Sequence, residues 1–258
     1  GKRFNFVISI STEMDKKIEK NWQTIPAFLS CAKNNLNILE EEVDLSVQKE
    51  YFEIIRELSF KPQKYKQLSS QYLEEINNLF DESIDDEVKK RMLVVLARID
   101  DISVYRAIES LSKTASPLKK WAVIALQQSR MLIQSTLMDT PGIFISTGLG
   151  GQNGMLRYFC VFLYRNPGTL LEFQHQIICN EITVALKPYK GILEQIDFFE
   201  DYCTLHLLFP LNADLKSIFE KTIDECNLYG NFLQRNMIIT NVKKLSEEEI
   251  KSILQKKK

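Results

Sequence analysis

The spacing of apolar residues changes once along the chain, near residue 140. Up to that point apolar side chains recur every three or four positions, the interval that places them on one face of a helix. These stripes are Met14, Ile18 and Trp22; Leu29, Ala32, Leu36 and Leu39 after Pro26; Val47, Tyr51, Ile54 and Leu58; and Tyr65, Leu68, Tyr72, Ile76 and Leu79. Beyond residue 140, short strand-like segments alternate with helical ones. The pattern predicts an α+β chain, with an all-α region at 1–139 and an α+β region at 140–258.

The change falls between Pro141 and Arg165, a stretch that holds five of the nine glycines. Residues 142–147 and 155–165 are rich in β-branched or aromatic side chains, so each predicts a strand. Between them, Asn153-Gly154 favours a tight turn because both residues accept positive φ. We therefore predict that Gly148 to Gly154 is a hairpin connection. At the other end of the chain, the alternation within 3–11 predicts a short strand that either joins this sheet or leads into the helices.

The glycine-rich loop is also the candidate ligand site of the sequence. Its backbone amides could hold a small ligand at Gly148, Gly150, Gly151, Asn153 and Gly154. A phosphate cradle requires a helix directly after the loop, with its amides directed at the anion. A strand follows here, and the glycine spacing is not GxGxxG, so a plain hairpin is the favoured interpretation. A helix beginning at Gly154 would favour the phosphate alternative.

The strand after the loop is apolar on both of its faces. One face carries Phe159, Val161 and Leu163, and the other carries Tyr158, Cys160, Phe162 and Tyr164. A strand of this kind is normally covered on both sides. We expect helices on one side, and the N-terminal half or a partner on the other.

Two helical segments in the first half are similar at a separation of thirty residues. EVKKRMLVVL at 87–96 aligns with PLKKWAVIAL at 117–126, with a basic pair followed by small and aliphatic residues in each. A helix–turn–helix period of this length is typical of stacked helical repeats. Residues 87–138 resemble HEAT-like repeats, which implies a helical face suited to a partner. An irregular bundle of amphipathic helices is the alternative.

The second half predicts the order strand, helix, strand, strand, helix, strand and a final helix. Asn166-Pro167 and either Asn212 or Asp214 are helix-start signals, and Ser246 to Glu249 forms a capping box. The predicted later strands are 191–199, 202–209 and 232–242. This order resembles the ferredoxin-like βαββαβ sandwich. Because that fold serves sensors, RNA binders, enzymes and dimerisation modules, the resemblance implies no single function.

The composition argues against several classes of protein. The chain is 45% hydrophobic and has a formal net charge of −1, so no overall positive field attracts nucleic acid or anionic membrane. Five isolated cysteines without CxxC spacing argue against a disulfide framework or a zinc site. No apolar run reaches the roughly 20 residues that span a bilayer. We expect a cytoplasmic protein, with a removed N-terminal signal or anchor left open because the chain starts at Gly1.

Few residues are candidates for catalysis or metal binding. His175 and Cys179 lie one helical turn apart and could form a nucleophile pair or two metal ligands, but no third group accompanies them. His206 lies within a predicted strand, where a structural role is favoured. The acidic run 81–87 lacks the glycine and distal glutamate of a calcium loop, and we assign it to helix capping. The sequence therefore predicts no catalytic residues, no metal ligands and no cofactor.

The strand aromatics raise the question of RNA, because exposed sheet aromatics stack on bases. The usual aromatic-glycine pattern and a basic surround are missing, so the sequence argues against nucleic acid. Our leading hypothesis is a non-enzymatic protein-interaction or regulatory module. Its helical face would bind a protein partner, and its α+β half would act as a platform or homodimerisation surface. The alternatives are a small-ligand sensor using the α+β half and an unrecognised enzyme.

Overall fold

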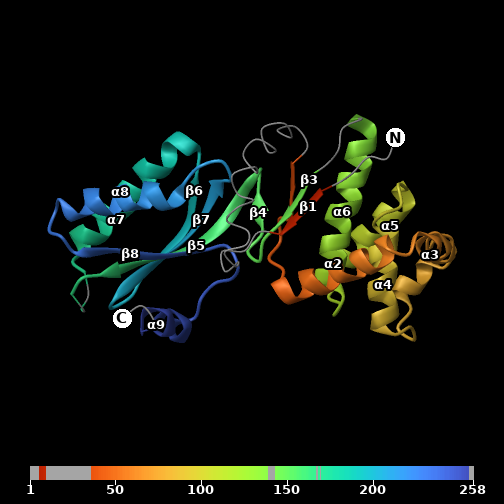
Figure 1. The fold of residues 1–258 in the computed structure, drawn as a ribbon. Coiled ribbons are helices and arrows are strands. Elements are labelled where there is room, and N and C mark those ends of the chain that lie inside the picture. The colour runs from red at the N-terminus through yellow and green to blue at the C-terminus, as the bar shows by residue number, and fades with distance from the viewer. Residues whose placement is uncertain (1–5, 10–35, 139–142, 167, 169, 256–258) are drawn as a thin grey trace. The chain divides into compact units, whose positions relative to one another are not determined.

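The computed structural model describes residues 6–9, 36–138, 143–166, 168 and 170–255 (Figure 1). The chain divides into two compact units, and along the described residues the division falls between Ser146 and Thr147. We refer to these as unit 1 and unit 2. None of the helices in this part of the chain has the length and apolarity that a membrane crossing requires.

Unit 1 is mainly helical. Its elements after residue 44 are α2 (Leu45–Ser59), α3 (Pro62–Glu74), the 3-10 helix η1 (Ile76–Phe80), α4 (Asp86–Leu96), α5 (Ile102–Ser112) and α6 (Lys119–Met138). The predicted stripes at Val47–Leu58 and Tyr65–Leu79 face one core, in which Tyr51, Leu58, Ile108 and Trp121 are buried. The stripe of Met14, Ile18 and Trp22 lies outside the described residues. The acidic run caps α4 as predicted, since the Asp85 carboxylate accepts a hydrogen bond from the Glu87 amide at 2.7 Å.

Unit 1 also contains a small parallel sheet, so the first half of the chain is not purely α-helical. The strand order is β1 (Phe6–Ser9), β3 (Ile143–Ser146) and β2 (Leu36–Ile38), with β3 in the middle. β1 and β2 both align with β3 in parallel, with Ile8 and Ile38 each opposite Ile145.

This sheet corrects two predictions. The helix expected after Pro26 does not extend to Leu39, because Leu36–Ile38 is a strand; residues 26–35 lie outside the described residues. The strands at 6–9 and 143–146 do not join the sheet of the second half. They pair with each other instead, which is why β3 lies in unit 1 although the sequence placed residue 140 onward in the second region.

Unit 2 has the element order predicted from the sequence. Its elements are β4 (Gly151–Gln152), β5 (Met155–Tyr164), α7 (Glu172–Leu186), the 3-10 helix η2 (Lys187–Tyr189), β6 (Ile192–Phe198), β7 (Tyr202–Pro210), α8 (Leu215–Asn227), β8 (Leu233–Thr240) and α9 (Glu247–Gln255). The main strands form an antiparallel sheet in the order β8, β5, β7, β6, and β4 pairs with the start of β5.

Both faces of this sheet are covered, as the apolar pattern of β5 predicts. On one face, Cys160 and Phe162 of β5 pack against α7 and α8, which lie side by side there (Figure 1). On the other face, Phe159 and Val161 pack with Leu149 and with Ile250 of α9. The second cover is therefore a helix of unit 2 itself, where the sequence suggested the N-terminal half or a partner.

The hairpin prediction is confirmed in a shorter form. Asn153 and Gly154 have φ of 52° and 77° and connect β4 to β5, with Gly151 opposite Leu156. The strand before the loop is β4 rather than residues 142–147, because Ile143–Ser146 belongs to the sheet of unit 1.

Candidate functional site

β8 departs from its regular ladder with β5 at one point. Phe162 pairs with Met237, but Tyr164 pairs with Leu233, so three β8 residues lie opposite Leu163 alone. These three residues are Gln234, Arg235 and Asn236. A bulge of this kind removes residues from the ladder and redirects their side chains, and bulges are common at sheet edges and beside functional sites.

The bulge is held in place by polar contacts. The Arg165 Nε donates to the Leu233 carbonyl at 2.9 Å, and the Gln234 Nε2 donates to the Tyr164 carbonyl at 2.7 Å. The Asn227 side chain both accepts from the Leu233 amide at 2.8 Å and donates to the Leu233 carbonyl at 3.0 Å. These bonds satisfy backbone groups that the irregular ladder would leave without partners.

The bulge borders an open hollow of about 360 Å³ lined by Arg165, Gln234, Arg235 and Asn236, which we call the bulge hollow. Within the described residues, no carboxylate lies within 4.0 Å of the Arg165 guanidinium, and its two terminal nitrogens make no hydrogen bond. Arg235 differs, because Asp224 binds its Nε at 2.9 Å and its Nη2 at 2.7 Å. Among the described residues, the positive charge of Arg165 in this hollow therefore has no carboxylate partner.

These groups are suited to an oxyanion. A guanidinium presents parallel N–H donors that match two oxygens of a phosphate or carboxylate. The Nε bond to the Leu233 carbonyl fixes the arginine, so less side-chain entropy is lost when an anion binds. The Asn236 amide adds further donor capacity at the same hollow.

Two amides of the glycine-rich loop already donate hydrogen bonds to backbone carbonyls. The Leu149 amide donates to the Asn241 carbonyl at 3.0 Å, and the Gly150 amide donates to the Thr147 carbonyl at 3.3 Å. The loop is followed by β5 and not by a helix, so the geometry of a phosphate cradle is missing there. A ligand at the remaining loop residues, including Gly148, Gly151, Asn153 and Gly154, stays a prediction.

His175 and Cys179 lie on the same side of α7, as their spacing predicts. They line an open hollow of about 440 Å³ together with Glu172, Gln176, Asn180 and Phe198. The His175 ring stacks on Phe198 at 4.0 Å between centroids. Burial raises the pKa of the Cys179 thiol, which disfavours the thiolate that a nucleophile needs.

The second histidine and the other described cysteines are buried. His206 is buried with its ring 5.0 Å from that of Phe159. Cys160, Cys203 and Cys226 are buried free thiols, and burial raises the pKa of Cys226 to about 12. Among the residues that the structure describes, no three His, Cys, Asp or Glu side chains are grouped in a way that could hold a metal ion.

Sequence reasoning missed the bulge hollow. The sequence predicts 232–242 as one continuous strand, and it assigns no role to Arg165. One signal was present in the sequence: Gln234, Arg235 and Asn236 are three consecutive polar residues between apolar ones. Such a run breaks the alternation of a half-buried strand and indicates an irregularity.

Comparison with known proteins gives distant structural neighbours. No family model matches the chain, and no curated protein matches it. One solved structure, a REP-associated tyrosine transposase bound to a REP hairpin, is 13% identical with a TM-score of 0.31. That match covers 39% of this chain and 62% of the transposase, so it spans about three fifths of its length. A second, a putative transposase from Deinococcus radiodurans, is 12% identical with a TM-score of 0.32, covering 41% of this chain and 91% of the other.

These neighbours contradict two expectations from the sequence. The non-enzymatic protein-interaction or regulatory module is not supported, because both neighbours are transposases. The expectation against nucleic acid is also wrong, because one neighbour is bound to a REP hairpin. At this level of similarity the neighbours do not carry a function for this chain, which has to be argued from its own residues.

Proposed function

We propose that this protein binds nucleic acid and that the bulge hollow of unit 2 holds a phosphate group of the sugar-phosphate backbone. The observation that carries the proposal is the fixed Arg165 guanidinium. It lies beside Asn236 in an open hollow, and no described carboxylate neutralises it. Arginine, asparagine and glutamine side chains supply many of the phosphate contacts that position proteins on nucleic acid.

The contact is local and does not depend on the overall charge. The net charge of −1 gives no long-range attraction, so affinity has to come from particular cations. A single oriented guanidinium contributes a charge-assisted hydrogen-bond pair, which is stronger than a bond between neutral groups. Phosphate contacts carry no base information, and the proposed binding at this hollow is therefore independent of sequence.

The proposal is tested by fluorescence anisotropy of the full chain with labelled oligonucleotides at several salt concentrations. Arg165→Gln should weaken binding about ten- to a hundredfold, from the roughly 1.5–3 kcal/mol of a hydrogen bond to a charged group. Lys216→Gln is the matched control, since it removes an exposed positive charge of unit 2 that faces Glu220. Equal affinities for the two variants, or no binding by the wild type at low salt, would refute the proposal.

We also infer that unit 2 is a ferredoxin-like module and that residues 87–138 are HEAT-like repeats. The strand order β8, β5, β7, β6 with α7 and α8 on one face supports the first assignment. The succession of α4, α5 and α6 around a common core supports the second. An experimental structure would test both, because stacked repeats require α4 and α6 to occupy equivalent positions in successive units.

A further inference from the structure

Unit 1 has a basic surface at α3. Between Glu57 and Glu74 the chain has three lysines, Lys61, Lys64 and Lys66, and no acidic residue. α3 lies at the surface, and Tyr72 is its one buried side chain. Positive charge is therefore concentrated on a helix that presents most of its residues to solvent.

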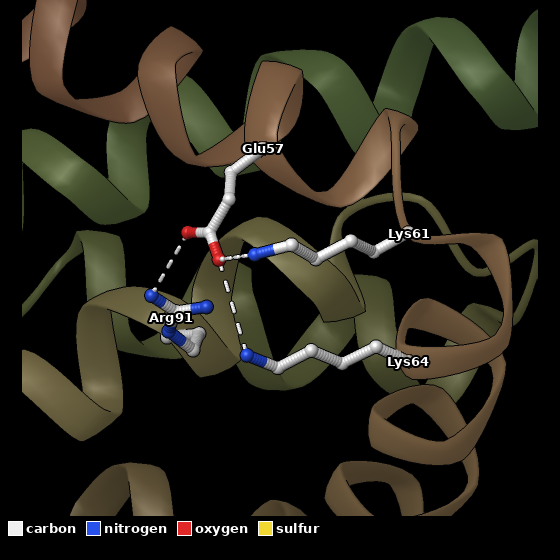
Figure 2. A network of polar contacts seen from close by, with 4 residues as sticks. All are labelled: Glu57, Lys61, Lys64 and Arg91. Carbon is white, nitrogen blue, oxygen red and sulfur yellow. Dashed lines mark hydrogen bonds and ion pairs between the residues drawn. The ribbon is translucent and has the colours of Figure 1, made fainter.

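One carboxylate, Glu57, lies among these lysines. Figure 2 shows Lys61, Lys64 and Arg91 converging on Glu57. Its Oε1 lies 3.1 Å from the Lys61 Nζ and 3.9 Å from the Lys64 Nζ, and its Oε2 lies 3.2 Å from the Arg91 Nη2. Hydrogen bonds from Lys61 and Arg91 lower the pKa of Glu57, which keeps it ionised. Three cations around one anion leave a local excess of two positive charges.

The basic helix also borders an open hollow. Its volume is about 510 Å³, and it is lined by Gln63, Lys64, Lys66, Gln67 and Ser70. These positions recur over two helical turns, so they form one face of α3. Among the described residues, Lys66 has no carboxylate within 4.0 Å. The hollow therefore offers ammonium, amide and hydroxyl groups, all of which bind phosphate oxygens.

An exposed aromatic residue is the sequence neighbour of Lys61. Phe60 directly follows α2 and precedes Lys61, and 80% of its surface is exposed to solvent. A phenyl ring so open to water contributes little to the core, since its apolar area stays hydrated. Surfaces that bind single-stranded nucleic acid combine a basic track for the backbone with aromatic rings on which bases stack.

We propose that Phe60, Lys61, Lys64 and Lys66, which we call the α3 basic face, bind single-stranded nucleic acid. The lysines contact phosphates, and Phe60 stacks on an unpaired base. The inference rests on the proposed function and specifies that the nucleic acid is single-stranded. A paired base is not available to stack on Phe60. An acidic peptide would also satisfy the lysines, and the experiment below separates the two by the dependence on base stacking.

The test uses the full chain, a labelled oligothymidine and the same strand annealed to its complement. Phe60→Ala should weaken binding of the single strand about five- to a hundredfold, the range for loss of one stacked base. Its effect on the duplex should stay within about twofold. Leu137→Ala is the control, since Leu137 is 81% exposed in the same unit. Equal loss for the two nucleic acids, or no loss for either, would overturn the stacking role.

A second variant tests the lysines. Replacing Lys61, Lys64 and Lys66 by Gln should reduce the slope of log affinity against log salt by about 2, at roughly 0.7 for each phosphate contact with a single strand. Lys113→Gln is the control, because Lys113 is exposed and faces Glu109 at 3.3 Å. An unchanged slope would refute the lysine contacts.

The two proposals fail in different ways. If Arg165→Gln weakens binding while the Phe60 and lysine variants do not, the α3 basic face is wrong and the bulge hollow stands. If the wild-type chain binds neither oligonucleotide, the proposed function fails, and the α3 basic face fails with it. Circular dichroism of each variant should match the wild type, since the substituted side chains are exposed.

Discussion

Replacing Gly148 by alanine should disrupt unit 2 although it adds only one methyl group. A Cβ at this position would lie 1.6 Å from the Val242 carbonyl oxygen and 2.6 Å from its carbonyl carbon. Ordinary contacts between such atoms are about 3.5 Å. Both nearest atoms belong to the backbone, so no side-chain rotation relieves the overlap. The glycine loop has to move away from the residues after β8 by about 2 Å.

The loss of stability in unit 2 can be estimated from the contacts that this movement breaks. The Leu149 amide loses its 3.0 Å hydrogen bond to the Asn241 carbonyl, at about 1 kcal/mol. Leu149 is 1% exposed and packs with Phe159 and Ile250, and uncovering it costs about 1.5–3 kcal/mol. We therefore expect a loss of about 2.5–4 kcal/mol in the stability of unit 2.

Native-state hydrogen exchange of the β5 and β8 amides measures this loss. A change of this size should accelerate exchange of the most protected amides on the order of a hundredfold or more. Gly154→Ala is the control, because a Cβ there meets no atom within 4 Å and the φ of 77° alone opposes it. Its cost should be about 1–2 kcal/mol. Wild-type exchange in Gly148→Ala, or a larger effect of Gly154→Ala, would show that the close approach to Val242 is not rigid.

Three further outcomes are expected. Asp224→Asn should strengthen oligonucleotide binding severalfold by releasing Arg235, and anisotropy that shows equal or weaker binding would place Arg235 outside the contact. A hydrogen bond from Arg157 lowers the pKa of Glu194 from its usual 4.5. The stability that Glu194 contributes is therefore complete above that pH and is lost as pH falls through the folded-state pKa. Glu194→Gln should remove this part of the acid dependence of the urea midpoint, and an unchanged dependence would contradict the assignment. A thiol reagent at pH 8, with sites mapped by mass spectrometry, should modify Cys179 well before the fully buried Cys203, and the reverse order would contradict the burial.

The sequence was enough to predict the features that depend only on residues close together in the chain. The apolar run in 155–165 predicted a strand covered on both faces, because successive side chains on a strand point to opposite sides and here both sets are apolar. Asn153-Gly154 predicted a turn because few other pairs accept positive φ twice, and the observed φ values agree. The caps of α4 and α9 follow from side chains within three residues of the helix start.

The missed features depend on pairing between distant segments. Leu36 and Leu39 have helical spacing, yet Leu36–Ile38 is a strand because β3 supplies its hydrogen-bond partner from residues 143–146. The bulge hollow likewise arises where the register between β5 and β8 shifts, and a single strand sequence does not contain its register. The spacing of His175 and Cys179 did predict their common helix face, since that relation is local.

The position of β3 has a consequence for synthesis of the protein. β3 is the middle strand of its sheet, but it is the last of the three to leave the ribosome. While α2 to α6 are being made, β1 and β2 have no strand between them to pair with. Unpaired strand edges are templates for association with other chains, and nascent intermediates that expose them aggregate readily. Translation pauses before residue 143 should therefore prolong the time that unit 1 depends on chaperones, and release of the next few residues should end it.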